Sequence, residues 1–342
     1  MQSTEKSADH LLITVEITNR CNYKCPYCYN QGDPNNYDFF SVHDGSEWLN
    51  AFRSKFEGRD LELYFTGGEV FVYKDFLEFL PKISNEPNVK WIQIDTNGSL
   101  TSKYLSILDP QKVSLMMTFH PTQVSLDKFI EEAQKLQEHG VLKMVNYVAY
   151  PFEIETLNKY LEKFTKLGIF LNVTWNINAI PEYDDFAWKV ICNLTTPEDT
   201  NYILRNSVYG KSCLAGVCYA NIDMYGNLYR CHGISKIGNI FDNKIELLKE
   251  AKPCKTIYCD CSVRYSLLTE NRFPSSHFLI GYVNRNREYR RQSGLEYGLT
   301  IDKPYKLYHP PAIPVGVRMQ SKASRMLRRL KRKSSSLINK IR

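Results

Sequence analysis

Long hydrophobic runs are missing from this sequence of 342 residues. No uninterrupted stretch of about 18 apolar residues occurs, and residues 1–10 are polar, without the apolar segment of a secretory signal peptide. These absences argue against a transmembrane helix and against secretion, and they predict a cytoplasmic protein. With 43% hydrophobic and 24% charged residues, the composition is that of a globular chain with a sizeable core.

Acidic residues are absent from residues 303–342, which contain 12 Lys and Arg. Removing these 12 bases from the total of 44 leaves 32 bases against 37 acids, so the rest of the chain carries −5 and this segment +12. Residues 304–317 form a proline-rich linker, and residues 318–342 place apolar side chains at helical spacing among the bases. We predict a basic amphipathic tail that contacts an anionic membrane peripherally. Nucleic acid as the partner and a solvated, partly disordered tail are the alternatives.

Ten cysteines, most of them in two groups with metal-ligand spacing, indicate metal sites instead of disulfides in a chain without a signal peptide. The first group is Cys21, Cys25 and Cys28, just after a hydrophobic run at residues 11–18. Three thiolates do not complete a tetrahedral zinc site, but they can hold three irons of a [4Fe–4S] cluster and leave the fourth iron open. A zinc site that borrows a fourth ligand from elsewhere is the alternative.

Hydrophobic strands alternate with amphipathic helices along residues 11–180. The expected strands cover residues 11–18, 61–66, 91–95, 113–119, 142–150 and 169–176. The expected helices cover residues 41–56 (with Ser41 or Asp44 as its cap), 73–83, 102–108, 125–138 and 154–167. Strict alternation predicts an α/β fold with a parallel sheet, whose functional site lies at the carboxyl ends of the strands.

Three motifs at these strand ends resemble the radical S-adenosylmethionine (radical SAM) superfamily. They are the Cys-x3-Cys-x2-Cys spacing at residues 21–28, Gly67-Gly68-Glu69 after the second strand, and Thr96-Asn97-Gly98 after the third. The resemblance covers roughly residues 10–180 and implies a partial (β/α)6 TIM-like barrel. It also implies a reductant such as flavodoxin or ferredoxin and a [4Fe–4S] cluster. The reduced cluster cleaves S-adenosylmethionine (SAM) to a 5′-deoxyadenosyl radical, which abstracts hydrogen from the substrate.

The resemblance assigns roles to individual residues of these motifs. Gly67, Gly68 and Glu69 are expected to bind the SAM amino group, with the glycines letting the backbone approach the ligand and leaving its polar groups free. Tyr27 is expected to pack near the adenine. Further candidate contacts to SAM or substrate are Thr96, Asn97, Thr118, Asn146, Trp175, Asn176 and His120, which is also the candidate catalytic residue. An ordinary Asn-Gly turn and a capping or core histidine are the plainer alternatives.

A second cysteine-rich region covers residues 211–265. Cys213 precedes, and Cys231 ends, a predicted hairpin that turns at Gly226, and this pattern resembles the opening of the SPASM and twitch extensions of radical SAM enzymes. The resemblance implies an auxiliary [4Fe–4S] cluster. We expect Cys213, Cys231, Cys259 and Cys261 to hold it, with Cys218 and Cys254 as further candidates; a structural zinc site is the alternative. Cys192 stands alone and is expected to be a buried core residue.

These features divide the chain into a polar N-terminus (1–10), a radical SAM-like core (11–180), an irregular connecting segment (181–210), the SPASM/twitch-like extension (211–265), a C-terminal segment (266–303), the linker and the tail. Peptide-modifying members of the resembled family commonly carry a recognition domain before the core. The short segment here therefore favours a small-molecule substrate, such as a sugar or glycan intermediate, with net oxidation or epimerisation. A peptide or protein modifier, sulfatase-maturase-like or a peptide cyclase, and a non-catalytic zinc or RNA-binding protein are the alternatives.

Overall fold

The computed structural model describes residues 10–28, 43–149, 153–174, 185–196, 208–231, 234–242, 244–256, 259, 267–269 and 278–296. Its centre is a sheet in which the first six strands lie in sequence order and pair in parallel. They are β1 (His10–Thr18), β2 (Asp60–Gly67), β3 (Val89–Thr96), β4 (Val113–Phe119), β5 (Leu142–Val148) and β6 (Leu171–Thr174). The predicted α/β fold with a parallel sheet is therefore confirmed.

Helices connect these strands, as the alternation predicted. They are α1 (Gly45–Lys55), the 3₁₀ turn η1 (Val70–Val72), α2 (Lys74–Ser84), the 3₁₀ helix η2 (Thr101–Ile107), α3 (Leu126–Glu138) and α4 (Ile154–Lys166). Asp44 caps α1, since its carboxylate accepts from the Ser46 and Glu47 amides at 2.8 and 2.9 Å. Glu47 returns a bond to the Asp44 amide at 2.9 Å, which completes a capping box.

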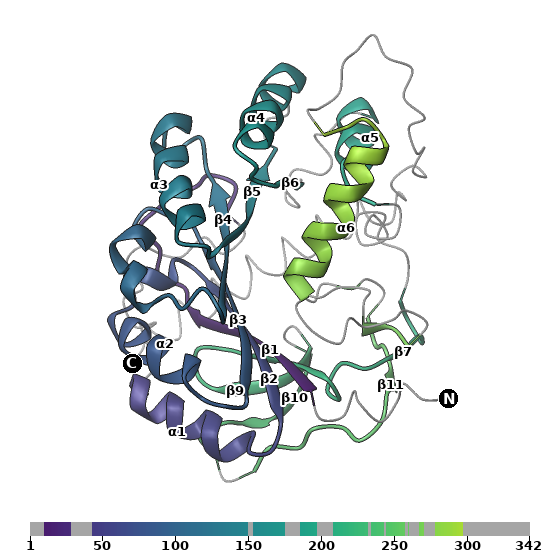
Figure 1. Ribbon diagram of the computed structural model, residues 1–342. Coiled ribbons are helices and arrows are strands. Elements are labelled where there is room, and N and C mark those ends of the chain that lie inside the picture. The colour runs from purple at the N-terminus through teal and green to yellow at the C-terminus, as the bar shows by residue number, and fades with distance from the viewer. Residues whose placement is uncertain are drawn as a thin grey trace, which may run out of the picture.

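The two faces of the sheet differ in polarity because side chains alternate along each strand. On β2, Leu61, Leu63 and Phe65 are at most 1% exposed and belong to the main hydrophobic core. Helices α1 to α4 lie outside this apolar face (Figure 1). The intervening side chains Tyr64 and Thr66 point to the opposite, inner face, where polar groups gather. Burial of the outer face holds the layers together, and the inner face is left available for ligands.

The cysteine-rich extension continues the core sheet. Strand β8 (Tyr219–Ile222) pairs in parallel with β1, and β9 (Asn227–Cys231) and β10 (Ile234–Asn239) follow in antiparallel pairing. The β8–β9 hairpin turns at Gly226, where φ is 75°, so the predicted hairpin is confirmed. A small second sheet pairs β7 (Ser212–Cys213) with β11 (Lys252–Pro253). The sheet therefore carries the second cysteine group on the edge beside β1.

Two helices lie where sequence analysis expected none. Helix α5 (Asp185–Asn193) falls in the segment predicted to be irregular, and α6 (Phe278–Gln292) falls in the C-terminal segment. Figure 1 shows the two helices side by side, near β6. Helix α6 has a weak apolar pattern because it buries polar residues that bond to β6: Tyr282 donates to Asn172 at 2.8 Å, and Arg290 donates to the Leu171 carbonyl at 2.6 Å. Tertiary hydrogen bonds thus replace the apolar stripe that a sequence search detects.

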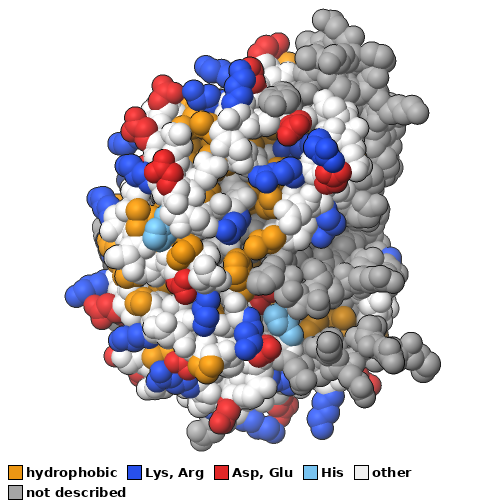
Figure 2. Space-filling view, viewed as in Figure 1, with side chains coloured by type: hydrophobic (Ala, Val, Ile, Leu, Met, Phe, Trp, Pro, Cys, Tyr) orange, Lys and Arg blue, Asp and Glu red, His pale blue; other side chains and the backbone are white. Residues whose placement is uncertain are grey.

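No helix in the part of the chain described here is long and apolar enough to cross a membrane. On the face drawn in Figure 2, acidic and basic side chains are interspersed and no patch of one sign forms. The predicted linker at residues 304–317, the tail at 318–342 and the candidate contacts Trp175 and Asn176 lie outside the described residues.

Candidate functional site

The loop that carries Cys21, Cys25 and Cys28, here called the cysteine loop (residues 19–28), is tied at its start to the end of β2. The Gly68 amide donates to the Thr18 carbonyl at 2.7 Å, and the Glu69 amide donates to the Arg20 carbonyl at 2.8 Å. A Cβ atom on Gly67 would lie 2.0 Å from the Thr18 carbonyl oxygen. The glycines therefore allow two backbones to meet. Sequence analysis expected the backbone groups here to be free for a ligand, but in the structure the amides of Gly68 and Glu69 are already hydrogen-bonded.

The turn after β3 makes a second set of contacts with the cysteine loop. Asn97 donates through Nδ2 to the Asn22 side chain at 2.9 Å, and the same nitrogen lies 3.8 Å from the Cys21 sulfur. Asn22 donates in turn to the Ser99 hydroxyl at 2.8 Å. The Thr-Asn-Gly sequence is therefore more than an ordinary turn, because its asparagine reaches a candidate metal ligand.

Glu69, which follows β2, forms hydrogen bonds through its side chain to the end of β3. Its side chain is fully buried, and Oε1 accepts from the Thr96 hydroxyl at 2.8 Å and the Phe71 amide at 3.1 Å, while Oε2 accepts from the Asn97 amide at 2.6 Å. Burial raises the pKa of Glu69 to about 7, although these three hydrogen bonds lower it. No cation pairs with it among the described residues. Because a carboxylate has about four acceptor positions, one further donor can still be accommodated.

The loop after β4 holds the far end of the cysteine loop. The Tyr27 hydroxyl and the His120 Nδ1 atom are 3.1 Å apart, and the two rings stack with centroids 5.8 Å apart. Burial lowers the pKa of His120 to about 4, so its imidazole is neutral near pH 7. The Lys24 amide also donates to the Gln123 side chain at 3.1 Å. In this structure His120 therefore contacts Tyr27 of the cysteine loop.

The three thiols of the cysteine loop interact electrostatically. Burial, followed by the charges of Cys28 and Cys21, raises the pKa of Cys25 to about 12. As the side chains stand, no three His, Cys, Asp or Glu residues in the described part of the chain form a group that could hold a metal ion. The donor set itself, three sulfurs on one loop braced from three sides, fits a cluster with one open iron better than it fits zinc.

Polar side chains continue from this site along the inner face of the sheet. Asp95 on β3 accepts hydrogen bonds from the hydroxyls of Tyr64 and of Thr66, the latter at 3.2 Å. Its second oxygen, Oδ1, is buried and meets no geometric hydrogen-bond donor among the described residues, although a side-chain contact with Gln93 lowers the carboxyl pKa. Burial outweighs these contacts and raises the pKa of Asp95 to about 7. Sequence analysis missed Asp95 and Tyr64. Both alternate with apolar residues along their strands, and this alternation is the signal that could have assigned them to the inner face.

On the far side of the inner face, a chain of hydrogen bonds links three elements. Thr118 on β4 lies opposite Asn146 on β5 in the strand register. Asn146 accepts from Asn172 on β6 at 2.9 Å, and Asn172 accepts from Tyr282 on α6 at 2.8 Å. The predicted candidates Thr118 and Asn146 thus lie on the face that a ligand would meet.

The second cysteine group converges on one place at the sheet edge beside β1. Burial, followed by the charges of Cys254, Cys213 and Cys259 in that order, raises the pKa of Cys231 to about 12, while the Arg230 charge lowers it. A small cavity is lined by Cys213, Cys231 and Cys254. Cys213, Cys231, Cys254 and Cys259, hereafter the auxiliary cysteine group, therefore belong to one hydrophobic cluster and influence one another electrostatically, although the described thiols as they stand do not form a metal-binding group. Four sulfur donors would suit an iron–sulfur cluster or a zinc ion.

The remaining cysteines are placed differently. Cys254, which sequence analysis ranked below Cys259 and Cys261, is part of the auxiliary cysteine group, whereas Cys261 lies outside the described residues. Cys218 is 1% exposed and packs in a small hydrophobic cluster with Cys213 and Tyr219. Cys192 is fully buried on α5, as predicted. The exact ligand set stays a prediction.

Parts of the chain are similar to a known protein family and to curated proteins. Residues 15–163 match the family described as the radical SAM superfamily. The probable GTP 3′,8-cyclase of Methanococcus maripaludis (strain C5) is 26% identical over 182 residues, which cover 52% of this chain and 54% of that protein. The GTP 3′,8-cyclase of Shewanella denitrificans is 33% identical over 93 residues, 27% of each chain. The chain therefore spans about half the length, or less, of these curated relatives.

Solved structures resemble a larger part of the fold. Native anSMEcpe with bound AdoMet and Cp18Cys peptide has a TM-score of 0.52 at 14% identity, and the match covers 82% of this chain and 97% of that one. Streptococcus suis SuiB bound to the precursor peptide SuiA has a TM-score of 0.51 at 19% identity, covering 70% of this chain and 64% of that one. At these identities the likeness shows the fold alone, a partial TIM-like barrel as expected.

Proposed function

We propose that this chain is a radical SAM enzyme that abstracts hydrogen from a carbon of a small polar molecule. The match of residues 15–163 to the radical SAM superfamily supports this proposal. Domains of this superfamily use a [4Fe–4S] cluster and SAM. When bound, they supply a 5′-deoxyadenosyl radical as the hydrogen-abstracting species. The observation that carries the proposal is the convergence of the loops after β2, β3 and β4 on the cysteine loop.

We assign the cluster-binding role to Cys21, Cys25 and Cys28. Glu69 is positioned to accept a hydrogen bond from the SAM ammonium group, because its buried carboxylate has an acceptor position left and no cationic partner among the described residues. Burial raises the pKa of Glu69, and a bound ammonium group would lower it again and keep the carboxylate ionised. Asn97 contacts the cysteine loop, and we assign to Tyr27, which bonds to His120, the role of packing near the adenine.

The polar inner face supports a small polar substrate. Asp95 offers a buried oxygen that has no hydrogen-bond partner among the described residues, next to the hydroxyls of Tyr64 and Thr66. These groups suit a substrate hydroxyl or amine, because an unpaired buried acceptor is costly until a donor reaches it. The curated relatives are named for a reaction of GTP, which is itself a small polar molecule. Sugars and nucleotides are therefore the substrate classes that we propose first.

We further propose that the auxiliary cysteine group, Cys213, Cys231, Cys254 and Cys259, holds an auxiliary [4Fe–4S] cluster. Four converging thiols support this assignment. Tyr64 connects the two regions, because it packs against the hydrophobic cluster around Cys213 while its hydroxyl bonds to Asp95 on the inner face. A zinc ion bound by the same thiols is the competing assignment.

The first test measures iron, sulfide and zinc per chain after anaerobic reconstitution, and then 5′-deoxyadenosine after addition of reductant and SAM. We expect about eight irons, four for each cluster, and SAM cleavage without added substrate. About four irons with one zinc would support the radical enzyme and overturn the auxiliary cluster. Zinc alone, without iron or SAM cleavage, would overturn the proposed function as a whole.

The substrate class is tested with the reconstituted enzyme and separate pools of nucleotides including GTP, nucleotide sugars, free sugars and short peptides. A substrate pool should raise 5′-deoxyadenosine formation above the substrate-free rate. A product two hydrogens lighter indicates oxidation, and a product of unchanged mass indicates epimerisation. Stimulation by peptides alone would contradict the small-molecule assignment and favour a peptide modifier.

A further inference from the structure

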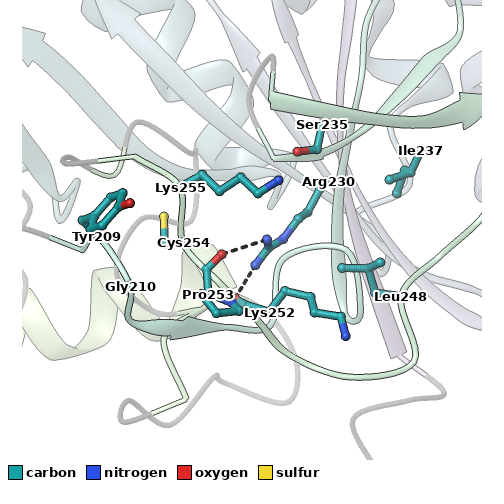
Figure 3. Close-up of a pocket in the computed structure, with 10 residues that line it drawn as sticks. All are labelled: Tyr209, Gly210, Arg230, Ser235, Ile237, Leu248, Lys252, Pro253, Cys254 and Lys255. Carbon is teal, nitrogen blue, oxygen red and sulfur yellow. Dashed lines mark hydrogen bonds between the residues drawn. The ribbon is translucent and has the colours of Figure 1, made fainter.

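Arg230, the residue before Cys231 on β9, joins the segments of the auxiliary cysteine group. Its side chain is only 8% exposed, and its guanidinium donates four hydrogen bonds to backbone carbonyls. Nε bonds to Ala215 at 2.8 Å, Nη1 bonds to Pro253 at 3.2 Å, and Nη2 bonds to Cys213 at 3.2 Å and to Lys252 at 2.6 Å. Figure 3 shows the guanidinium reaching the strand of Lys252 and Pro253, next to Cys254. One planar fork thus fixes the backbone near three of the four cysteines.

The charge of Arg230 has no acidic partner in the part of the chain described here. All four acceptors are neutral carbonyls, and none of the recorded ion pairs includes Arg230. A buried cation is costly unless an anion lies nearby. The thiols of Cys213, Cys231 and Cys254 can become anionic and line a small cavity together with Arg230. Thiolates bound to a metal there would place negative charge beside the guanidinium.

Arg230 also borders a larger cavity next to the auxiliary cysteine group. This cavity of about 420 Å³ is lined by Tyr209, Leu248 and Lys255 among others (Figure 3). The Arg230 side chain lines both this cavity and the small one with the thiols. Cys254 also lines both cavities, so the larger opening reaches the auxiliary cysteine group beside Arg230.

We propose that Arg230 is the positioning and charge-balancing residue of the auxiliary metal site, holding the segments of Cys213, Cys231 and Cys254 in place and compensating the negative charge of the bound thiolates. This inference rests on the proposed auxiliary cluster. It predicts two separable effects. The hydrogen bonds of the guanidinium hold the cysteine segments and so determine how much iron the auxiliary site binds, whereas the positive charge determines the reduction potential of the cluster. A nearby cation favours the more negatively charged, reduced state of a cluster.

The test uses a Cys25→Ala/Cys28→Ala background, in which only the auxiliary cluster is expected to bind iron. Arg230→Gln removes the charge, and Arg230→Lys keeps the charge but loses the fork. Iron per chain and the reduction potential, followed by electron paramagnetic resonance, are measured in the full-length chain. We expect Arg230→Gln to shift the potential to more negative values, and Arg230→Lys to keep the potential while losing more than half of the iron.

Arg290→Gln is the matched control, because Arg290 is also buried and donates to the carbonyls of Leu194 and Leu171, which belong to segments that carry no residue of the auxiliary cysteine group. It should leave iron content and potential unchanged. Full iron and an unchanged potential in Arg230→Gln would overturn the inference. If the background variant binds zinc instead, the auxiliary cluster is wrong, and the inference is judged by zinc content: lower zinc in Arg230→Gln than in Arg290→Gln supports it, and equal zinc overturns it.

Discussion

The two cysteine groups of this protein are held by opposite means. The cysteine loop is held by polar contacts from outside, through Gly68, Asn97 and His120 on three different strand ends, and Cys21 is exposed. The auxiliary cysteine group packs against a hydrophobic cluster and is held by one buried guanidinium. A site that must admit a ligand keeps an accessible side, whereas a site that only holds a metal can be closed. The comparison indicates a reactive first site and a supporting second one.

The largest effect is expected when one thiol is removed from each group, which tests whether the two groups have different roles. Cys28→Ala should reduce SAM cleavage by more than about 100-fold, because a cluster cannot be held by two thiolates, and should leave about four irons per chain. Cys231→Ala should also lose about four irons, yet keep substrate-free SAM cleavage within about threefold. Liquid chromatography of 5′-deoxyadenosine and iron analysis give the two readouts. Equal loss of SAM cleavage in both variants would contradict the division of roles.

A second prediction concerns the cofactor side of the cysteine loop. Glu69→Gln should weaken SAM binding by about 10- to 100-fold, because a hydrogen bond to a charged group contributes about 1.5–3 kcal/mol. Glu62→Gln is the control. Glu62 is also buried, but it lies near the start of β2, where its Oε2 atom is 3.5 Å from the Nε2 atom of His10. Equilibrium dialysis of SAM against each reconstituted variant measures the effect. Similar weakening in both variants would argue for a general loss of folding.

The inner face between the two regions should show a pH dependence of stability. The folded-state pKa of Asp95, about 7, is above its ordinary value of 3.8, so the folded protein holds this proton more tightly than the unfolded chain. The stabilisation is complete below about pH 4 and is lost as the pH rises to about 7, at a cost of up to about 4 kcal/mol. Denaturant unfolding between pH 5 and 7.5 measures this slope. Asp95→Asn should flatten it, and parallel curves for the two proteins would exclude Asp95 as its source.

The smallest predicted effect compares two tyrosine hydroxyls, one in each region. Tyr27 bonds to His120 at 3.1 Å, and the fully buried Tyr219 bonds to Thr14 at 3.1 Å. Replacing either with Phe should lower the free energy of unfolding by about 1 kcal/mol, since one hydrogen bond is lost. Only Tyr27→Phe should also change SAM affinity, by about two- to threefold. A change in affinity for Tyr219→Phe of the same size would remove the distinction.

Sequence patterns predicted the core of the fold because its signals are local. Strand β4, for example, was predicted within the residues it occupies, since a run of apolar residues bounded by turn signals defines a buried strand. Asp44 was one of two caps predicted for helix α1, Ser41 being the other, and the structure shows that it caps this helix. Helix α6 was missed because it docks through Tyr282, Asn286 and Arg290, whose polar side chains hide the buried face.

Spacing along the chain was enough to predict the order of strands and helices, the strand-end positions of the motifs and the two groups of cysteines, because these features are local. Tertiary structure alone decided which groups meet. It brought Gly68 to the Thr18 carbonyl, Glu69 between Thr96 and Asn97, and Arg230 among the carbonyls near the cysteines. Hydrogen bonds and charge pairs between distant residues depend on the packing of the sheet, and no spacing in the sequence encodes them.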